Sequence, residues 1–336
     1  AHLKGTTLVG AALKNSNPTN AILSDTDLRR VILTGVDLSG ADLRNAHLAG
    51  VDLSGTNLKG GHLAGANLSN GDFYGANLTG ADLRNANLTG ADLSGADLTG
   101  ADLTGAAVTR VNLMGATLSD TDLTGANLSG AALSDRDLRS ANLTGASLAA
   151  SDLRNVNLTG MNLSGADLSE ANLTDTNLSG VDLSNSNLSG ADLHHTDLSG
   201  AKLIGANLTG ANLLGADVSR TDLTDVNLTD VNLTDVRLSD GNLSGMNLSG
   251  IKMTKANLTN ASLTGANLTS VNLTGADLTG ADLSGANLTD VDVSGANLTG
   301  VKLRSATLFG AVLKNSNLSN AILSDTDLRS VILTEV

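Results

Sequence analysis

Several residue types on which ordinary globular cores depend are missing or nearly missing from the sequence. The 336 residues include no cysteine, no tryptophan, one proline, one tyrosine and two phenylalanines. The absence of cysteine excludes disulfides and thiolate metal sites and leaves the cellular compartment open. Without aromatic side chains of varied shape, the interior must be filled by repetition of a few small and aliphatic residues.

Positive charge and long apolar runs are also scarce. The formal net charge is −14, which disfavours nonspecific attraction to nucleic acid or anionic lipid and favours solubility. No stretch approaches the roughly 18 apolar residues of a membrane span, and the opening AHLKGTTLVG lacks a signal-peptide layout. We therefore expect no nucleic-acid binding and no membrane insertion. The repeat is already under way at Ala1, which suggests a processed or partial product.

A period of five residues runs through the whole chain without interruption. From Ala1 the sequence divides into 67 pentapeptides plus Val336, and the third position is Leu in 61 of them. The first position is mostly small, the second mostly Asn or Asp, and the fourth Ser, Thr, Lys or Arg. This period fits neither a helix nor a flat strand, so each unit must contain its own bend.

Glycine indicates where the bend lies. Of the 38 glycines, 35 stand at the fifth position, which suits a type II turn with positive φ at its third residue. Each unit is then a short extended segment with Leu pointing inward, followed by a corner, and four corners close a square coil of 20 residues.

Units such as ADLTG, ANLSG and ADLRN resemble the A(D/N)LXX motif of the pentapeptide repeat family, and the resemblance covers the whole chain. It implies an all-β fold, a right-handed quadrilateral β-helix, with no globular domain and with the second, fourth and fifth positions facing outward. At the β-sheet spacing of about 4.8 Å, residues 1–336 would form a single continuous solenoid of about 17 coils and about 80 Å. Such a solenoid exposes Leu at an open end, where relatives commonly carry a cap.

A second, longer period connects the two ends of the sequence. Residues 7–36 recur as residues 307–336 with 24 of 30 positions identical, at an offset of 300 residues. That offset is a whole number of 20-residue coils, so the recurring surface returns to the same face. The recurrence predicts a 300-residue super-repeat of a longer array; a single duplication that marks the ends of a self-contained rod is the alternative.

No constellation of residues predicts catalysis, and we expect no catalytic, cofactor or metal site. The nearest candidate is His194 and His195 beside Asp192 and Asp197, but both histidines fall at corner positions where we expect them exposed.

Aspartates recur every 20 residues and should form columns, with Asp82, Asp102 and Asp122 in one and Asp52, Asp72 and Asp92 in another. Calcium could relieve the repulsion between these carboxylates, although each site would offer few fixed oxygens. A screened acidic face is the alternative.

The recurring Asn-Leu-Thr and Asn-Leu-Ser sequons follow from the repeat itself and give no support for glycosylation.

A few residues depart from the pattern. Arg136 occupies a first position, where we expect its stem inside and its head turned out toward Asp135 or Asp137. Pro18 replaces a central Leu and should weaken pairing between coils, because it has no amide hydrogen.

One outward column should contain Tyr74, Met114, His194 and Leu214. These residues are either scattered apolar side chains on the surface or a surface for lateral bundling.

Two functions of different classes fit the sequence, and neither is enzymatic. The first is a structural segment of a larger fibrous protein, extracellular or on the surface of a microbe, which associates with itself into fibres or stacks end to end. The second, implied by the family resemblance, is an acidic mimic of DNA in the cytoplasm that binds a type II topoisomerase. One net charge per roughly 6 Å is sparse beside one per about 1.7 Å of DNA, and this favours the structural function.

Overall fold

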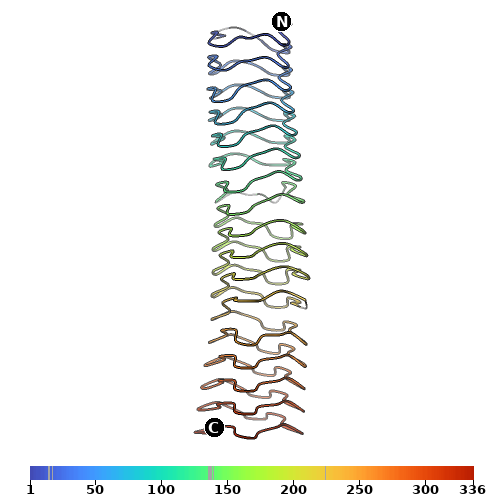
Figure 1. Cartoon of the computed structure of the whole chain (residues 1–336), viewed down its shortest axis with the longest axis vertical. Helices are drawn as coiled ribbons and strands as arrows, with labels where there is room; N and C mark the ends of the chain where they lie inside the picture. Colours follow the sequence, from blue (N-terminus) through green and yellow to red (C-terminus); the bar gives the residue numbers. More distant parts are fainter. Residues whose placement is uncertain (14–15, 17, 135–137, 139, 224) are drawn as a thin grey trace. The chain divides into compact units, whose positions relative to one another are not determined.

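The computed structural model describes residues 1–13, 16, 18–134, 138, 140–223 and 225–336. These fall into two compact units, which we call unit 1 (Ala1–Asn157 with Ala166–Asn172) and unit 2 (Leu158–Gly165 with Leu173–Val336). Within each unit the chain winds into coils of 20 residues that stack on one another, as Figure 1 shows.

A parallel backbone ladder with an offset of 20 residues holds the coils together. In the described residues the β structure consists of isolated bridges at second positions, such as Asp82 with Asp102, and there are no helices or longer strands. The N–H of Leu83 donates to the C=O of Asp102 at 2.7 Å, and the N–H of Asp102 donates to the C=O of Ala81 at 2.9 Å. Repetition of these two bonds gives the all-β coil expected from the sequence. No helix in the described part is long and apolar enough to cross a bilayer.

The corners confirm the turn expected from the glycine positions. In most of the described turns the N–H of the next unit's first residue donates to the C=O of the central residue, as Ala81 does to Leu78 at 3.0 Å. Positive φ occurs at fifth positions, in 35 glycines and in 29 other described residues such as Asn85 at 56°. The coil therefore requires the left-handed conformation at these 64 corners, and glycine is the residue that adopts it most easily.

The core is formed by the first and third positions, as the sequence predicts. From Leu23 to Leu313 the described central residues are almost fully buried, including Phe73 in place of Leu. A Cβ at Gly71 would lie 2.8 Å from Cε2 of Phe73, so the larger ring is accommodated by the loss of its neighbour's side chain. Buried threonines at first positions satisfy their hydroxyls across coils, as Thr56 Oγ1 does by donating to the C=O of Leu33 at 2.9 Å.

Candidate interaction surface

The outward side chains of each unit are organised first by a local turn at the second position. The carboxylate or amide Oδ1 of this residue accepts the backbone N–H two residues later, and a Ser or Thr hydroxyl at that place donates to the same oxygen. Asp102 Oδ1 accepts the N–H of Thr104 at 2.9 Å and its Oγ1 at 2.6 Å. This arrangement fixes the rotamer of the Asp or Asn and satisfies an amide that the coil ladder does not use.

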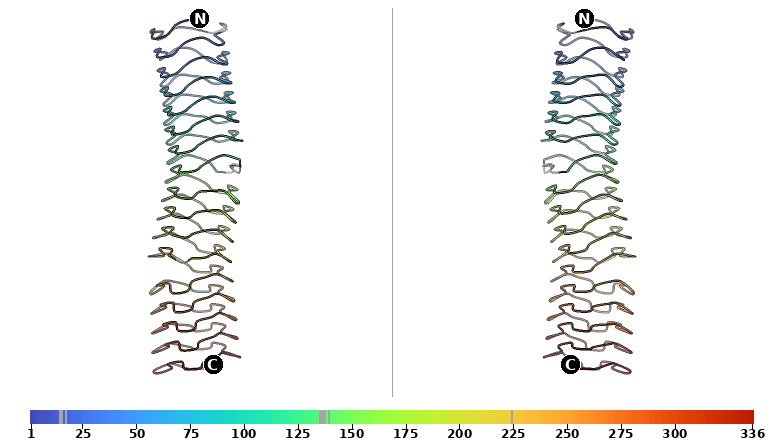
Figure 2. Two further views of the ribbon diagram at one scale, coloured as in Figure 1. Left: turned by 90° about the vertical axis from the view of Figure 1, so that its right-hand side faces the viewer. Right: turned by 90° about the vertical axis from the view of Figure 1, so that its left-hand side faces the viewer.

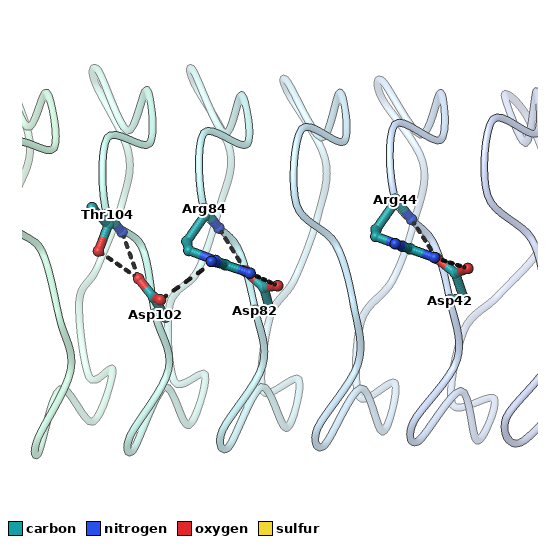
Figure 3. A network of polar contacts seen from close by, with 6 residues as sticks. All are labelled: Asp42, Arg44, Asp82, Arg84, Asp102 and Thr104. Atoms are coloured by element: carbon teal, nitrogen blue, oxygen red, sulfur yellow. Dashed lines mark hydrogen bonds and ion pairs between the residues drawn. The ribbon is translucent and has the colours of Figure 1, made fainter.

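Where arginine stands at the fourth position, it forms a fork with the same carboxylate. Arg44 Nε and Nη2 donate to the two oxygens of Asp42, both at 2.8 Å. Arg84 binds Asp82 in the same way, and its Nε lies 3.6 Å from Asp102 Oδ2 in the next coil. Figure 3 shows Arg84 between the two aspartates. Each fork arginine therefore offsets the charge of its own unit's aspartate, and Arg84 also lies close to the carboxylate of the next coil.

The arginine forks and some of the turns lower the pKa of the aspartate that they hold. The hydrogen bonds from the Arg44 side chain, opposed by desolvation and aided by the Arg44 backbone N–H and charge, lower the pKa of Asp42 to about 2. The Thr99 hydroxyl and N–H lower the pKa of Asp97 below its ordinary value. Lowered pKa values do not suit proton transfer near neutral pH, which requires a group that titrates close to it.

The expected aspartate columns are present, since Asp82, Asp102 and Asp122 pair in successive coils, and some second-position aspartates accept a hydrogen bond from an asparagine of the next coil. Asn112 Nδ2 donates to Asp92 Oδ1 one coil earlier at 3.1 Å, and Asn57 Nδ2 donates to Asp37 Oδ1 at 3.0 Å. Asparagine thus bridges successive coils at positions where a second carboxylate would repel the first. No group of three or more His, Cys, Asp or Glu side chains suited to a metal ion lies within the described part of the chain.

The two histidines are not equally exposed, so the expectation for His194 was wrong. His194 is half-buried, because its ring lies 4.0 Å from that of His195, and its backbone N–H donates to Asp192 Oδ1 at 3.2 Å. His195 is exposed, as expected, and its Nδ1 lies 3.9 Å from Asp175 Oδ1. A Cβ on Gly215 would lie 2.5 Å from His195 Cδ2, so the ring covers this glycine. Asp197 accepts only the N–H of Ser199 within its own turn, and the four residues do not converge.

The other irregular positions have varied outcomes. Tyr74 and Met114 are exposed by 63% and 61%, as expected for the outward column, whereas Leu214 is half-buried. Arg136 lies outside the described residues, as do Asp135 and Asp137. Pro18 accepts the turn hydrogen bond from Ala21 at 2.8 Å, and the N–H of Asn20 still donates to Ser39 C=O at 2.9 Å. The coil bonds therefore resume two residues after the proline.

Two features of the surface escaped sequence reasoning. The arginine forks follow from the local pattern Asp-Leu-Arg, and this pattern could have predicted them. Forks form at residues 27–29, 42–44, 82–84, 152–154 and 327–329, and the sixth copy of the pattern, at 137–139, lies partly outside the described residues. The second is a break in the coil ladder of unit 2, caused by bulky first-position residues 20 apart.

The profile of the pentapeptide repeats family matches residues 1–85 and 96–334 in overlapping segments. The chain therefore belongs to the pentapeptide repeat family, whose members form right-handed quadrilateral β-helices. Members are generally non-enzymatic scaffolds for structure or protein interaction.

Solved structures with similarity to this chain include three pentapeptide repeat proteins. One is HetL, involved in heterocyst differentiation regulation, from the cyanobacterium Nostoc sp. strain PCC 7120, with 27% identity over 94% of this chain and 92% of that one, and a TM-score of 0.27. Rfr23 from the cyanobacterium Cyanothece 51142 has 32% identity over 35% of this chain and 87% of its own, with a TM-score of 0.24. QnrB1, a plasmid-mediated fluoroquinolone resistance protein, has 19% identity over 70% of this chain and 94% of its own, with a TM-score of 0.23. No curated protein matches the sequence.

Proposed function

We propose that the chain is a structural segment of a repetitive filament, which acts as a stiff scaffold through its length and through coil-on-coil stacking. The observation that carries the proposal is the recurrence of residues 7–36 as residues 307–336 in unbroken register. A binding site needs one surface, whereas a scaffold benefits from repeated surfaces at fixed intervals.

The two copies also indicate what surface a stacking partner must offer. Leu23, Leu28 and Leu33 are each 1% exposed, and residues 37–56 supply the next coil. Their counterparts Leu323, Leu328 and Leu333 are 38%, 40% and 59% exposed. A coil like that of residues 37–56, from a continuing array or from another copy, would bury these leucines at roughly 1.5–3 kcal/mol each.

The outward surface supports a scaffold as well. Local turns, forks and asparagine bridges hold many of its carboxylates in place, as for Asp42, whose pKa is lowered to about 2, and the net charge of −14 keeps neighbouring filaments apart. A position outside the cell or on a microbial surface suits such a filament.

A tandem chain tests the proposal. Joining Val336 directly to Asp37 of a second copy keeps the five-residue register, because Val336 occupies the place of Val36. The additional 300 residues should lengthen the particle by about 72 Å at about 4.8 Å per coil. Electron microscopy and small-angle scattering would measure this increment. A particle that folds back or forms two separate globules would overturn the proposal.

Self-association is tested separately by two variants in one coil. Leu328→Asp places a charge on the stacking face, whereas Ile322→Asp adds the same charge at a second position, where Asp is common; the two residues are 40% and 43% exposed. Sedimentation should show concentration-dependent growth for the parent and Ile322→Asp, and none for Leu328→Asp. Equal behaviour of the two variants would argue against stacking through this face.

The alternative is an acidic protein that occupies the DNA-binding surface of a type II topoisomerase. Its support is the net charge of −14. A gyrase supercoiling assay distinguishes the two functions, because inhibition or protection from a quinolone at stoichiometric concentrations would favour this alternative over the filament.

A further inference from the structure

Some side chains larger than alanine at the first position lengthen or break the bonds between coils. The C=O of Ala81 accepts the N–H of Asp102 at 2.9 Å, whereas the C=O of Val111 accepts the N–H of Ala132 at 3.2 Å, although Val181 and Val291 keep bonds of 2.9 Å. Beneath Val51, the described residue Val31 no longer accepts the N–H of Asp52. One β-branched residue over another can therefore break a ladder bond.

Unit 2 contains two such pairs side by side. Val226 lies beneath Met246, and Val231 lies beneath Ile251. Within the described stretch 225–252, several bonds that the regular ladder would form are not made, among them Leu228 N–H to Asn247 C=O, Asn247 N–H to Val226 C=O, Asp230 N–H to Ser249 C=O, and Lys252 N–H to Val231 C=O.

The ladder is closed on both sides of this gap, which we call the seam (residues 225–234 facing residues 244–252). Leu223 N–H donates to Asn242 C=O at 3.0 Å, and Leu233 N–H donates to Lys252 C=O at 3.1 Å. Figure 2 shows the coils farther apart at this level, where the colour passes from yellow to orange. The seam is therefore a gap in the ladder of unit 2 that hydrogen bonds close on both sides.

An open pocket of about 1020 Å³ occupies the seam, with Asn227, Thr229, Asn232 and Ser249 among its polar lining. This volume is at the upper end of the roughly 300–1,000 Å³ typical of ligand sites. Met246 and Ile251, exposed by 9% and 8%, lie on its inner side with Val226 and Val231. The pocket thus has an apolar interior and polar rims.

The rims define the chemistry of an occupant. The N–H groups of Leu228 and Asp230 on one rim and the C=O groups of Asn247 and Ser249 on the other make none of the ladder hydrogen bonds that the regular coil would give them. Another extended backbone complements both rims at once, since it carries donors and acceptors on its two edges. A small aliphatic side chain at alternate positions would fill the apolar interior.

Charge adds a preference for a basic segment. The coil of residues 221–240 has Asp at all four corners, Asp225, Asp230, Asp235 and Asp240, and two of these line the pocket. The only arginine of that coil, Arg237, is bound to Asp217 of the preceding coil at 3.0 Å. Lys252 is the one cation in the lining.

We propose that the seam binds an extended, lysine-bearing polypeptide segment, which pairs its backbone with both rims and places small and aliphatic side chains inside. The bulky pairs at Val226/Met246 and Val231/Ile251 hold the site open. This site is distinct from the stacking face of the filament, and its test does not depend on filament formation.

The test is binding of a fluorescein-labelled decapeptide, AKLTGAKLTG, to the full chain by anisotropy. A matched peptide, AKPTGAKPTG, has proline in place of both leucines and so loses two backbone donors. We expect saturable binding of the first peptide and binding at least about tenfold weaker for the second, from the loss of two hydrogen bonds. Hydrogen exchange of the Leu228, Asp230, Asn247 and Lys252 amides should slow when the first peptide is added.

Protein variants complete the test. Alanine at Val226, Val231, Met246 and Ile251 restores the commonest first-position residue, so the variant should fold, close the ladder and lose peptide binding. Val271→Ala with Val291→Ala is the control, because that stacked valine pair keeps the bridge from Asn272 to Asp292; peptide binding should be unchanged. Absence of binding by the parent chain, equal binding of the proline peptide, or binding retained by the four-alanine variant would overturn the proposal.

Discussion

Replacement of the corner residue Gly80 measures what the left-handed turn demands of the sequence. Gly80 has φ of +62°, and a Cβ at this position would meet nothing within 4 Å. Substitution by alanine therefore changes only the backbone preference. The left-handed region costs an ordinary L-residue about 1–2 kcal/mol, and alanine regains about 0.4–1 kcal/mol by restricting the unfolded chain. The net expectation is destabilisation by about 1 kcal/mol.

Gly80→Asn is the matched variant, because asparagine tolerates the left-handed conformation, as Asn85 does at 56°. Native-state hydrogen exchange at the Ala81 amide, which closes this turn at 3.0 Å, measures the local free energy. We expect exchange about fivefold faster in Gly80→Ala and nearly unchanged in Gly80→Asn.

A second comparison adds a steric contribution to the same backbone change. At Gly65, with φ of +69°, a Cβ would lie 2.5 Å from Asn45 Oδ1 of the preceding coil. Gly65→Ala should destabilise its turn more than Gly80→Ala does, because the Asn45 side chain must move. The reasoning would be refuted if Gly80→Ala exchanged like the parent, or if asparagine destabilised the turn as much as alanine.

Two further predictions concern the surface and the ladder. Arg44→Ala should return the pKa of Asp42 from about 2 toward its ordinary value, which NMR titration would measure. Because this pKa is lower in the folded than in the unfolded protein, it stabilises the fold above the unfolded pKa, and the contribution is lost as pH falls through about 2. The parent should therefore resist acid unfolding better than the variant. Val51→Ala should allow Asp52 to pair with Val31 again and slow exchange of the Leu33 and Asp52 amides, whereas unchanged exchange would show that side-chain size does not open that ladder position.

The sequence predicts the repeating parts of the structure well, because each is determined within one unit. Leucine at the third position and glycine at the fifth define the buried face and the corner, and both are found where the pattern places them. The 20-residue ladder follows once four corners close a coil. The Asp-Leu-Arg forks are equally local and were open to prediction.

The exceptions depend on contacts between coils, which the period of five does not encode. His194 is half-buried because its ring packs against its neighbour, although its position in the repeat is an outward one. The seam requires Val226 and Val231 to meet Met246 and Ile251, and it appears only when residues 20 apart are compared by size. Val271 lies beneath Val291, yet the bridge between Asn272 and Asp292 is kept. A bulky pair alone therefore does not determine whether the ladder opens, which also depends on the geometry of the surrounding coil.

The central claim, a coil of 20 residues that rises by one ladder spacing, is tested most directly by distances between spin labels within unit 1. The protein has no cysteine, so pairs can be introduced at Ser69 with Ser129, Ala49 with Ser129, and Ala49 with Ala149, all in one outward column. We expect separations of about 14, 19 and 24 Å, rising by about 4.8 Å for each added coil. Separations that fail to increase by a constant step with each 20 residues would contradict the account.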